Sequence, residues 1–138
     1  MLQRIQTIWL LLAAVLSFVT LRFPVYNGNK TVEGVNEYNM LSATSSLFLI
    51  ALAVATGLIA FVTLFLYKNR SMQLKLCFAG LLLCILSGAL YYAQIRSFAE
   101  GAFSLWSVLY FLIPVCFILA IRGIYRDQKL VKSIDRLR

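Results

Sequence analysis

The chain has 138 residues, of which 62% are hydrophobic, with a formal net charge of +8 and no histidine. Four long runs contain no Asp, Glu, Lys or Arg, and they lie between Arg4 and Arg22, Glu37 and Lys68, Lys75 and Arg96, and Glu100 and Arg122. A run of about 18 or more such residues can cross a hydrocarbon core of about 30 Å. The pattern predicts an all-α integral membrane protein with four transmembrane helices in one domain. Because no folded basic module remains, we expect no nucleic-acid partner.

The first predicted span covers about residues 5–21. A charged start followed by an apolar run also fits a secretory signal peptide, but Thr20-Leu21-Arg22-Phe23 lacks the small-x-small pattern of a cleavage site. We therefore expect an uncleaved helix that ends near Phe23-Pro24, because proline interrupts the helical hydrogen bonds.

The longest connection follows at residues 22–43, and its two basic and two acidic residues cancel. Asn27-Gly28 lies between residues that suit β-strands, which is typical of a tight hairpin turn. A small hairpin over the membrane is one interpretation of this segment, and an irregular loop is the other.

The remaining spans are predicted at about residues 44–67, 76–93 and 103–121. Lys68, Arg70 and Lys75 form a basic connection between the second and third spans. Pro114 lies inside the fourth span, where a proline is expected to kink the helix.

The distribution of charge predicts the orientation in the membrane. The 68–75 connection holds three basic and no acidic residues, and the tail at 122–138 holds six basic and two acidic residues. Cytoplasmic segments next to spans carry an excess of Lys and Arg. We therefore expect both termini to be cytoplasmic and the connections at 22–43 and 94–102 to face outward.

Small side chains on the second and third spans predict helix contacts. Gly80, Cys84 and Gly88 recur every four residues on the third span, and Ala53 and Gly57 offer a similar surface on the second. Helices in lipid associate by close backbone approach, which small residues permit. We expect the two surfaces to pack against each other, with a homodimer or partner-helix interface as the alternative.

The sequence does not indicate an enzyme. There is no histidine to act as a general base or metal ligand, and all five acidic residues lie outside the predicted spans. Cys77, Cys84 and Cys116 lie inside spans and form no CxxC motif. We therefore expect no catalytic residue, no cofactor and no metal site.

The tail predicts an amphipathic basic helix, which could rest on the anionic lipid bilayer or bind a protein. In the second case its apolar residues would fill a groove on a cytoplasmic partner, and Asp135 would pair with a partner cation or with Lys132 or Arg138. The apolar face comprises Leu130, Ile134 and Leu137, and the neighbouring basic face includes Arg126, Lys129 and Arg136.

Two terminal strings resemble a known family. They read Leu-Gln-Arg-Ile-Gln-Thr at positions 2–7 and Lys-Leu-Val-Lys-Ser-Ile-Asp-Arg-Leu-Arg at positions 129–138. Both are similar to the ends of a family of short four-span inner-membrane proteins of Bacteroidota, known only as a domain of unknown function. The resemblance implies a bacterial inner-membrane location, and it implies no substrate, cofactor or catalytic residue.

These observations favour a structural or accessory subunit of an inner-membrane complex, which offers its cytoplasmic ends to a membrane or cytoplasmic protein partner. The alternative is a small transporter or lipid-handling protein. The spans lack the ionisable residue that usually couples transport to protons, which makes the alternative weaker.

The predicted orientation can be tested with a reporter that is active only in the cytoplasm. The reporter should be active when fused after Arg138 and inactive when inserted within residues 22–42, because the basic segments determine the cytoplasmic side. Activity at the loop position would contradict the orientation.

Overall fold

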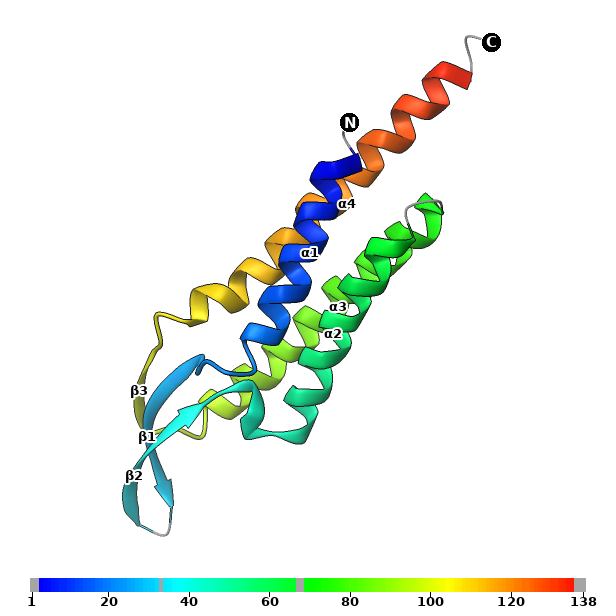
Figure 1. Cartoon of the computed structure of the whole chain (residues 1–138). Coiled ribbons are helices and arrows are strands. Elements are labelled where there is room, and N and C mark those ends of the chain that lie inside the picture. The colour runs from blue at the N-terminus through cyan, green and yellow to red at the C-terminus, as the bar shows by residue number, and fades with distance from the viewer. Residues whose placement is uncertain (1–2, 33, 67–68, 136–138) are drawn as a thin grey trace.

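The computed structural model describes residues 3–32, 34–66 and 69–135. These residues form four α-helices, a small antiparallel sheet and one turn of 3-10 helix (Figure 1). The chain is mostly helical, as predicted, but the sheet departs from the all-α expectation. The elements in order are α1 (Gln3–Val19), β1 (Tyr26–Val32), β2 (Val35–Leu41), η1 (Ala43–Ser45), α2 (Leu47–Phe65), α3 (Arg70–Ile95), β3 (Glu100–Phe103) and α4 (Ser107–Asp135).

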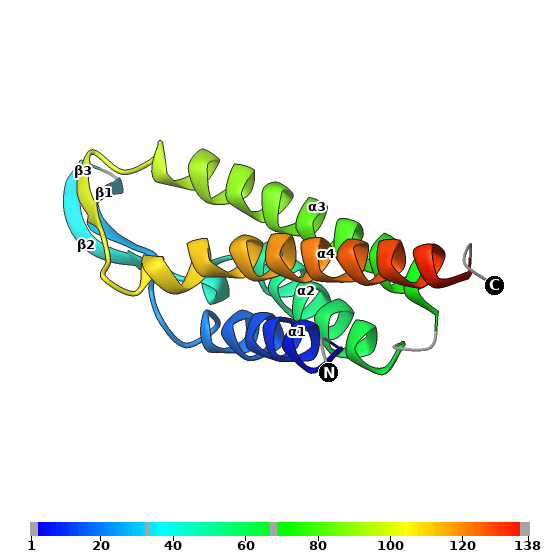
Figure 2. The same cartoon turned by 90° about the horizontal axis from the view of Figure 1, so that it is seen from above.

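The four helices form an antiparallel bundle in which each helix contacts two neighbours. α1 packs against α2 and α4, and α3 packs against the same two helices from the other side (Figure 2). The contact between α1 and α4 is the most extensive of the four. The centre of the bundle is filled by Leu10 and Ala13 of α1 and by Phe117, Ala120 and Ile124 of α4, all fully buried.

The outer surface of the bundle is apolar. On α1, for example, Ile5, Ile8, Leu11 and Val15 are all exposed. A water-soluble bundle would present polar side chains there, whereas an apolar outer face suits contact with lipid. α2, α3 and the Ser107–Val131 part of α4 are long and apolar enough to cross a membrane, and the apolar part of α1, Ile5–Val19, is shorter. The chain has the features of a membrane protein.

A three-stranded sheet covers one end of the bundle, with β1 between β2 and β3 (Figure 1). β1 and β2 form a hairpin whose last pair is Val32 with Val35, and Gly34 adopts a φ of 82°, which favours glycine. The hairpin is therefore present, but its turn is not at Asn27-Gly28. That dipeptide lies inside β1, where Asn27 pairs with Met40 and Gly28 with Asn39.

The third strand joins the two predicted outward connections into one structure. β3 pairs antiparallel with β1, and Gly28 lies opposite Gly101. A side chain at Gly28 would collide with the Glu100 carbonyl, so the close approach of the strands requires glycine there. On the bundle side, Val25, Tyr26 and Leu41 form a second buried cluster with Leu49 of α2 and Tyr91 of α3.

Two helices are longer than their predicted spans. α3 begins at Arg70, so Arg70 and Lys75 belong to the helix and not to the connection before it. α4 contains Pro114 and continues through Arg122 to Asp135 as one helix. The predicted tail helix is therefore the end of α4 and not a separate element.

Candidate functional site

The predicted small-residue surface of α3 faces α4. A Cβ atom at Gly80 would lie 2.6 Å from two ring carbons of Phe117, and one at Gly88 would lie 3.2 Å from the Tyr110 hydroxyl. Between them, the carbonyl of Cys84 accepts a 2.8 Å hydrogen bond from Tyr110. The space left by the small residues is thus occupied by aromatic side chains of α4.

The small-residue surface of α2 faces α1. A Cβ atom at Gly57 would lie 3.0 Å from the ring of Phe18, and the carbonyl of Ala53 accepts a 3.2 Å hydrogen bond from the Ser17 hydroxyl. The nearest side chains to Gly80 and Gly88 thus come from α4, and the nearest to Gly57 comes from α1. The prediction placed these glycines in the contact between α2 and α3, and these two helices also pack against each other.

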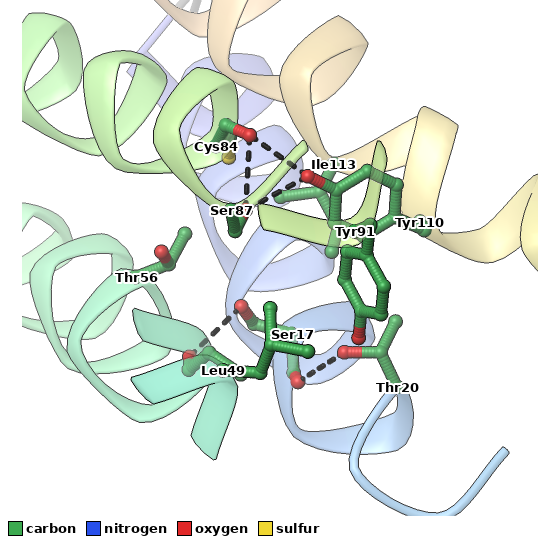
Figure 3. Close-up of a pocket in the computed structure, with 10 residues that line it drawn as sticks. Ser17, Thr20, Leu49, Thr56, Cys84, Ser87, Tyr91, Tyr110 and Ile113 are labelled. Carbon is green, nitrogen blue, oxygen red and sulfur yellow. Dashed lines mark hydrogen bonds between the residues drawn. The ribbon is translucent and has the colours of Figure 1, made fainter. Parts of the chain in front are cut away.

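Hydroxyl groups from all four helices gather around a small cavity in the bundle (Figure 3). Its volume of about 10 Å³ is close to that needed for one water molecule. The hydroxyls of Ser87 and Tyr110 lie 2.8 Å apart, and the Tyr91 ring packs edge-on against Tyr110 at 5.1 Å between centroids. Figure 3 shows the Tyr91 hydroxyl pointing toward Thr20.

The hydroxyl cluster links neighbouring helices. Ser17 joins α1 to α2, and Tyr110 joins α4 to α3 through the Cys84 carbonyl. Thr20 and Thr56 donate to carbonyls of their own helical turns, at 2.7 Å each. Away from water, such bonds satisfy groups that would otherwise be costly to bury. The cluster can fix helix positions and hold a water, and its lining contains no carboxylate, Lys or Arg.

A second polar site joins α1 to α4 near the end of the bundle opposite the sheet. The Gln6 amide donates a 2.7 Å hydrogen bond from Nε2 to Oδ2 of Asp127, and both side chains are buried. Arg70 of α3 donates from Nη1 to the backbone carbonyl of Asp127 at 3.2 Å. Gly123 makes room for this contact, because a Cβ atom there would lie 2.7 Å from Cγ of Gln6.

The burial of Asp127 is not evident from the positions of the charges, because every acidic residue lies outside the predicted spans. The helical spacing of α4 does indicate this burial. Ile113, Phe117, Ala120 and Ile124 form one buried stripe of α4, and Asp127 follows three residues after Ile124 on the same face. A carboxylate on an otherwise apolar stripe indicates a specific partner, which here is Gln6.

Five of the predicted contact residues of the tail lie on the last turns of α4. Arg126 and Lys129 are exposed, as are Leu130 and, next to it, Val131. For Ile134 and Asp135 only the helical backbone is described. The remaining predicted contacts, Arg136 and Leu137, lie outside the described residues.

The described part of the chain contains no group of three His, Cys, Asp or Glu residues that could hold a metal ion. Cys77, Cys84 and Cys116 are free thiols, and all three are buried. The interactions observed at the two polar sites are hydrogen bonds between helices.

The comparison with protein families decides the affiliation of the chain. The model of a family described as a domain of unknown function, DUF4293, matches residues 2–137. The chain belongs to this family. No curated protein and no solved structure matches it significantly. The DUF4293 domain thus covers nearly the whole chain.

The α3–α4 contact predicts different effects at two glycines. Gly80→Ala should lower the free energy of unfolding by about 1–3 kcal/mol, because the fully buried Phe117 ring has no room to move. Gly88→Ala should cost much less, because the added methyl meets only the Tyr110 hydroxyl. Unfolding in mixed micelles, followed by circular dichroism, measures both.

Two further variants control this experiment. Leu82→Ala changes an exposed position on the same helix and should have a small effect. Phe117→Leu should relieve the Gly80→Ala variant, because a smaller side chain leaves space for the methyl group. Equal losses for Gly80→Ala and Gly88→Ala, with no relief by Phe117→Leu, would show that the contact is misassigned.

Proposed function

We propose that this protein is a non-catalytic accessory subunit of a bacterial inner-membrane complex and that the end of α4 binds its partner. In this proposal the chain crosses the membrane four times, with both termini in the cytoplasm. The protruding end of α4 is the observation that carries the proposal.

The position of α1 supports a fourth span. Its 17 residues measure about 25 Å along the helix axis, which approaches the thickness of a hydrocarbon core. α1 lies between α2 and α4, and its outward face is apolar along its length. Near its sheet end, Phe23 stacks on Trp106 at 4.1 Å between ring centroids, and aromatic residues are common at the membrane–water interface.

The two ends of the bundle support the orientation. α1 begins and α4 ends at the same end, opposite the sheet (Figure 1). The same end carries the basic residues Arg70, Arg122, Arg126 and Lys129, whereas the charges of the sheet connection at 22–43 cancel. By the positive-inside rule, the basic end is cytoplasmic and the sheet faces outward.

The end of α4 protrudes beyond the rest of the bundle (Figure 1). The helix from Arg122 to Asp135 adds about 20 Å after the last uncharged residue of the span. A helix that rests on a lipid surface has to turn into the membrane plane, but α4 leaves the bundle without a break. This geometry favours a protein partner over the lipid surface.

The side chains of the protruding segment define the partner surface. Leu130 and Val131 are 46% and 42% exposed, and they continue the stripe of α4 that is buried against α1 at Ile124 and Asp127. Arg126 and Lys129 flank this apolar face. The matching surface on the partner is an apolar groove with carboxylates along its rim. The opposite charges of the two surfaces would also accelerate association.

A small transporter or lipid-handling protein is the alternative function. The cavity lined by the hydroxyl cluster has a volume of about 10 Å³, which suits one water molecule and no larger solute. This cavity therefore gives no support to a solute path between the helices.

The proposal predicts that a tagged chain purified from native membranes in gentle detergent carries a foreign subunit in stoichiometric amount. Leu130→Asp and Ile134→Asp should remove that subunit, because a buried, unpaired charge is costly in an apolar groove. The double variant Arg126→Glu/Lys129→Glu should only weaken its binding. Mass spectrometry of each preparation measures the ratio of subunits.

Gln128→Glu is the matched control, because it adds the same negative charge about 160° around the helix from Leu130. The partner should still co-purify with this variant. A partner that also co-purifies with the Leu130→Asp and Ile134→Asp variants would contradict the role of α4. A preparation that contains only copies of this chain would contradict the accessory role and support a homodimer.

A further inference from the structure

A polar groove of about 430 Å³ lies at the sheet end of the molecule, far from the protruding end of α4. It is formed where the bundle side of the sheet meets the end of α3 and the segment before α2. Lys30 and Asn39 contribute from the sheet, Ser46 from the start of α2, and Gln94 from the end of α3. The volume falls within the range of small-molecule sites.

The strand geometry explains why Lys30 and Asn39 share this groove. Successive residues of a strand point to opposite faces, so Lys30 lies on the same face as Tyr26, which is packed into the buried cluster beneath the sheet. Asn39 pairs with Gly28 of β1, and paired residues also share a face. The sheet therefore turns an ammonium and an amide toward α3.

Within the described residues, four of the six polar side chains that line the groove lack a protein partner, whereas Ser45 and Ser97 bond to backbone groups. Within the described residues, Lys30, Asn39, Ser46 and Gln94 form no side-chain hydrogen bond or ion pair. Ser46 occupies the N-cap position of α2, yet its hydroxyl makes no capping bond. Glu37 is paired with Lys30 and therefore shares its face of the sheet, but it is exposed, forms no ion pair with Lys30 and does not line the groove.

The chemistry of the lining selects the kind of ligand. It contains one cation, several hydrogen-bond donors and no carboxylate, so it does not suit a divalent metal, which prefers anionic oxygen ligands. A lysine ammonium is a compact charge that binds phosphate well, and amide and hydroxyl donors can bind the remaining phosphate oxygens. Four such groups around one space fit an anion that accepts several hydrogen bonds.

We propose that this groove binds a phosphate-bearing group, with Lys30 as its charge partner and Asn39, Ser46 and Gln94 as hydrogen-bond donors. The group could belong to a membrane lipid or to a soluble phosphate ester. Next to Ser46, Leu47 and Phe48 are 79% and 74% exposed, so acyl chains could lie beside the groove. The site is separate from the proposed partner surface, because it uses the opposite end of the molecule.

Native mass spectrometry of the full chain tests the lipid source with two probes. Phosphatidylglycerol carries a phosphate, and diacylglycerol has the same chains without it. The chain should retain phosphatidylglycerol and lose diacylglycerol. Calorimetry with glycerol 3-phosphate tests the soluble source, because this probe has the phosphate without the chains. Binding of both phosphate probes would indicate that the groove recognises the phosphate itself, and binding of only one would identify its source.

Lys30→Gln should reduce binding of the phosphate probe about tenfold, because it removes a charge-assisted hydrogen bond. Arg96→Gln removes one positive charge at the same end of the molecule but outside the groove lining, and it should leave binding unchanged. Gln94→Ala provides a second groove variant if Lys30→Gln does not fold. Equal binding of diacylglycerol, equal losses for Lys30→Gln and Arg96→Gln, or no binding of either phosphate probe would overturn the proposal.

Discussion

The antiparallel contact between α1 and α4 holds the two ends of the chain together, and the other helices are arranged around it. Lipid provides little hydrophobic force between helices, so helix association depends on close packing and on hydrogen-bonded polar groups. The α1–α4 contact contains both features. Leu10 and Ala13 pack with Phe117 and Ala120 in the centre, and toward the basic end the buried Gln6 amide binds the Asp127 carboxylate. Because either group would be costly to bury alone, the pair favours one register of α1 on α4.

This register makes the two ends of the molecule different. Gln6 is near the start of α1, so the part of α4 after Asp127 extends past the contact and exposes Leu130 and Val131. At the other end, β3 pairs with β1 and ties the connection before α4 to the connection after α1. One end thus carries a protruding basic helix, which we propose binds a partner, and the other end carries the sheet and the polar groove.

The sequence predicts the helices well, because the length and hydropathy of a run are local properties. It does not predict which helices meet. Gly80 and Gly57 are recognisable as contact residues, but their neighbours Phe117 and Phe18 come from distant parts of the chain. β3 has four residues and pairs with a strand about seventy residues earlier, so no local pattern reveals it. The groove around Lys30 depends on this same long-range assembly.

Disulfide trapping in native membranes tests the α1–α4 contact most directly. Gln6→Cys and Gly123→Cys are introduced together, with a protease site inserted between Val32 and Val35. After oxidation and cleavage, the two halves should stay linked on a non-reducing gel, because a Cβ atom at Gly123 lies 2.7 Å from Cγ of Gln6. Halves that separate as readily as those of the Ile8→Cys/Gly123→Cys control, in which Ile8 is exposed, would contradict the account.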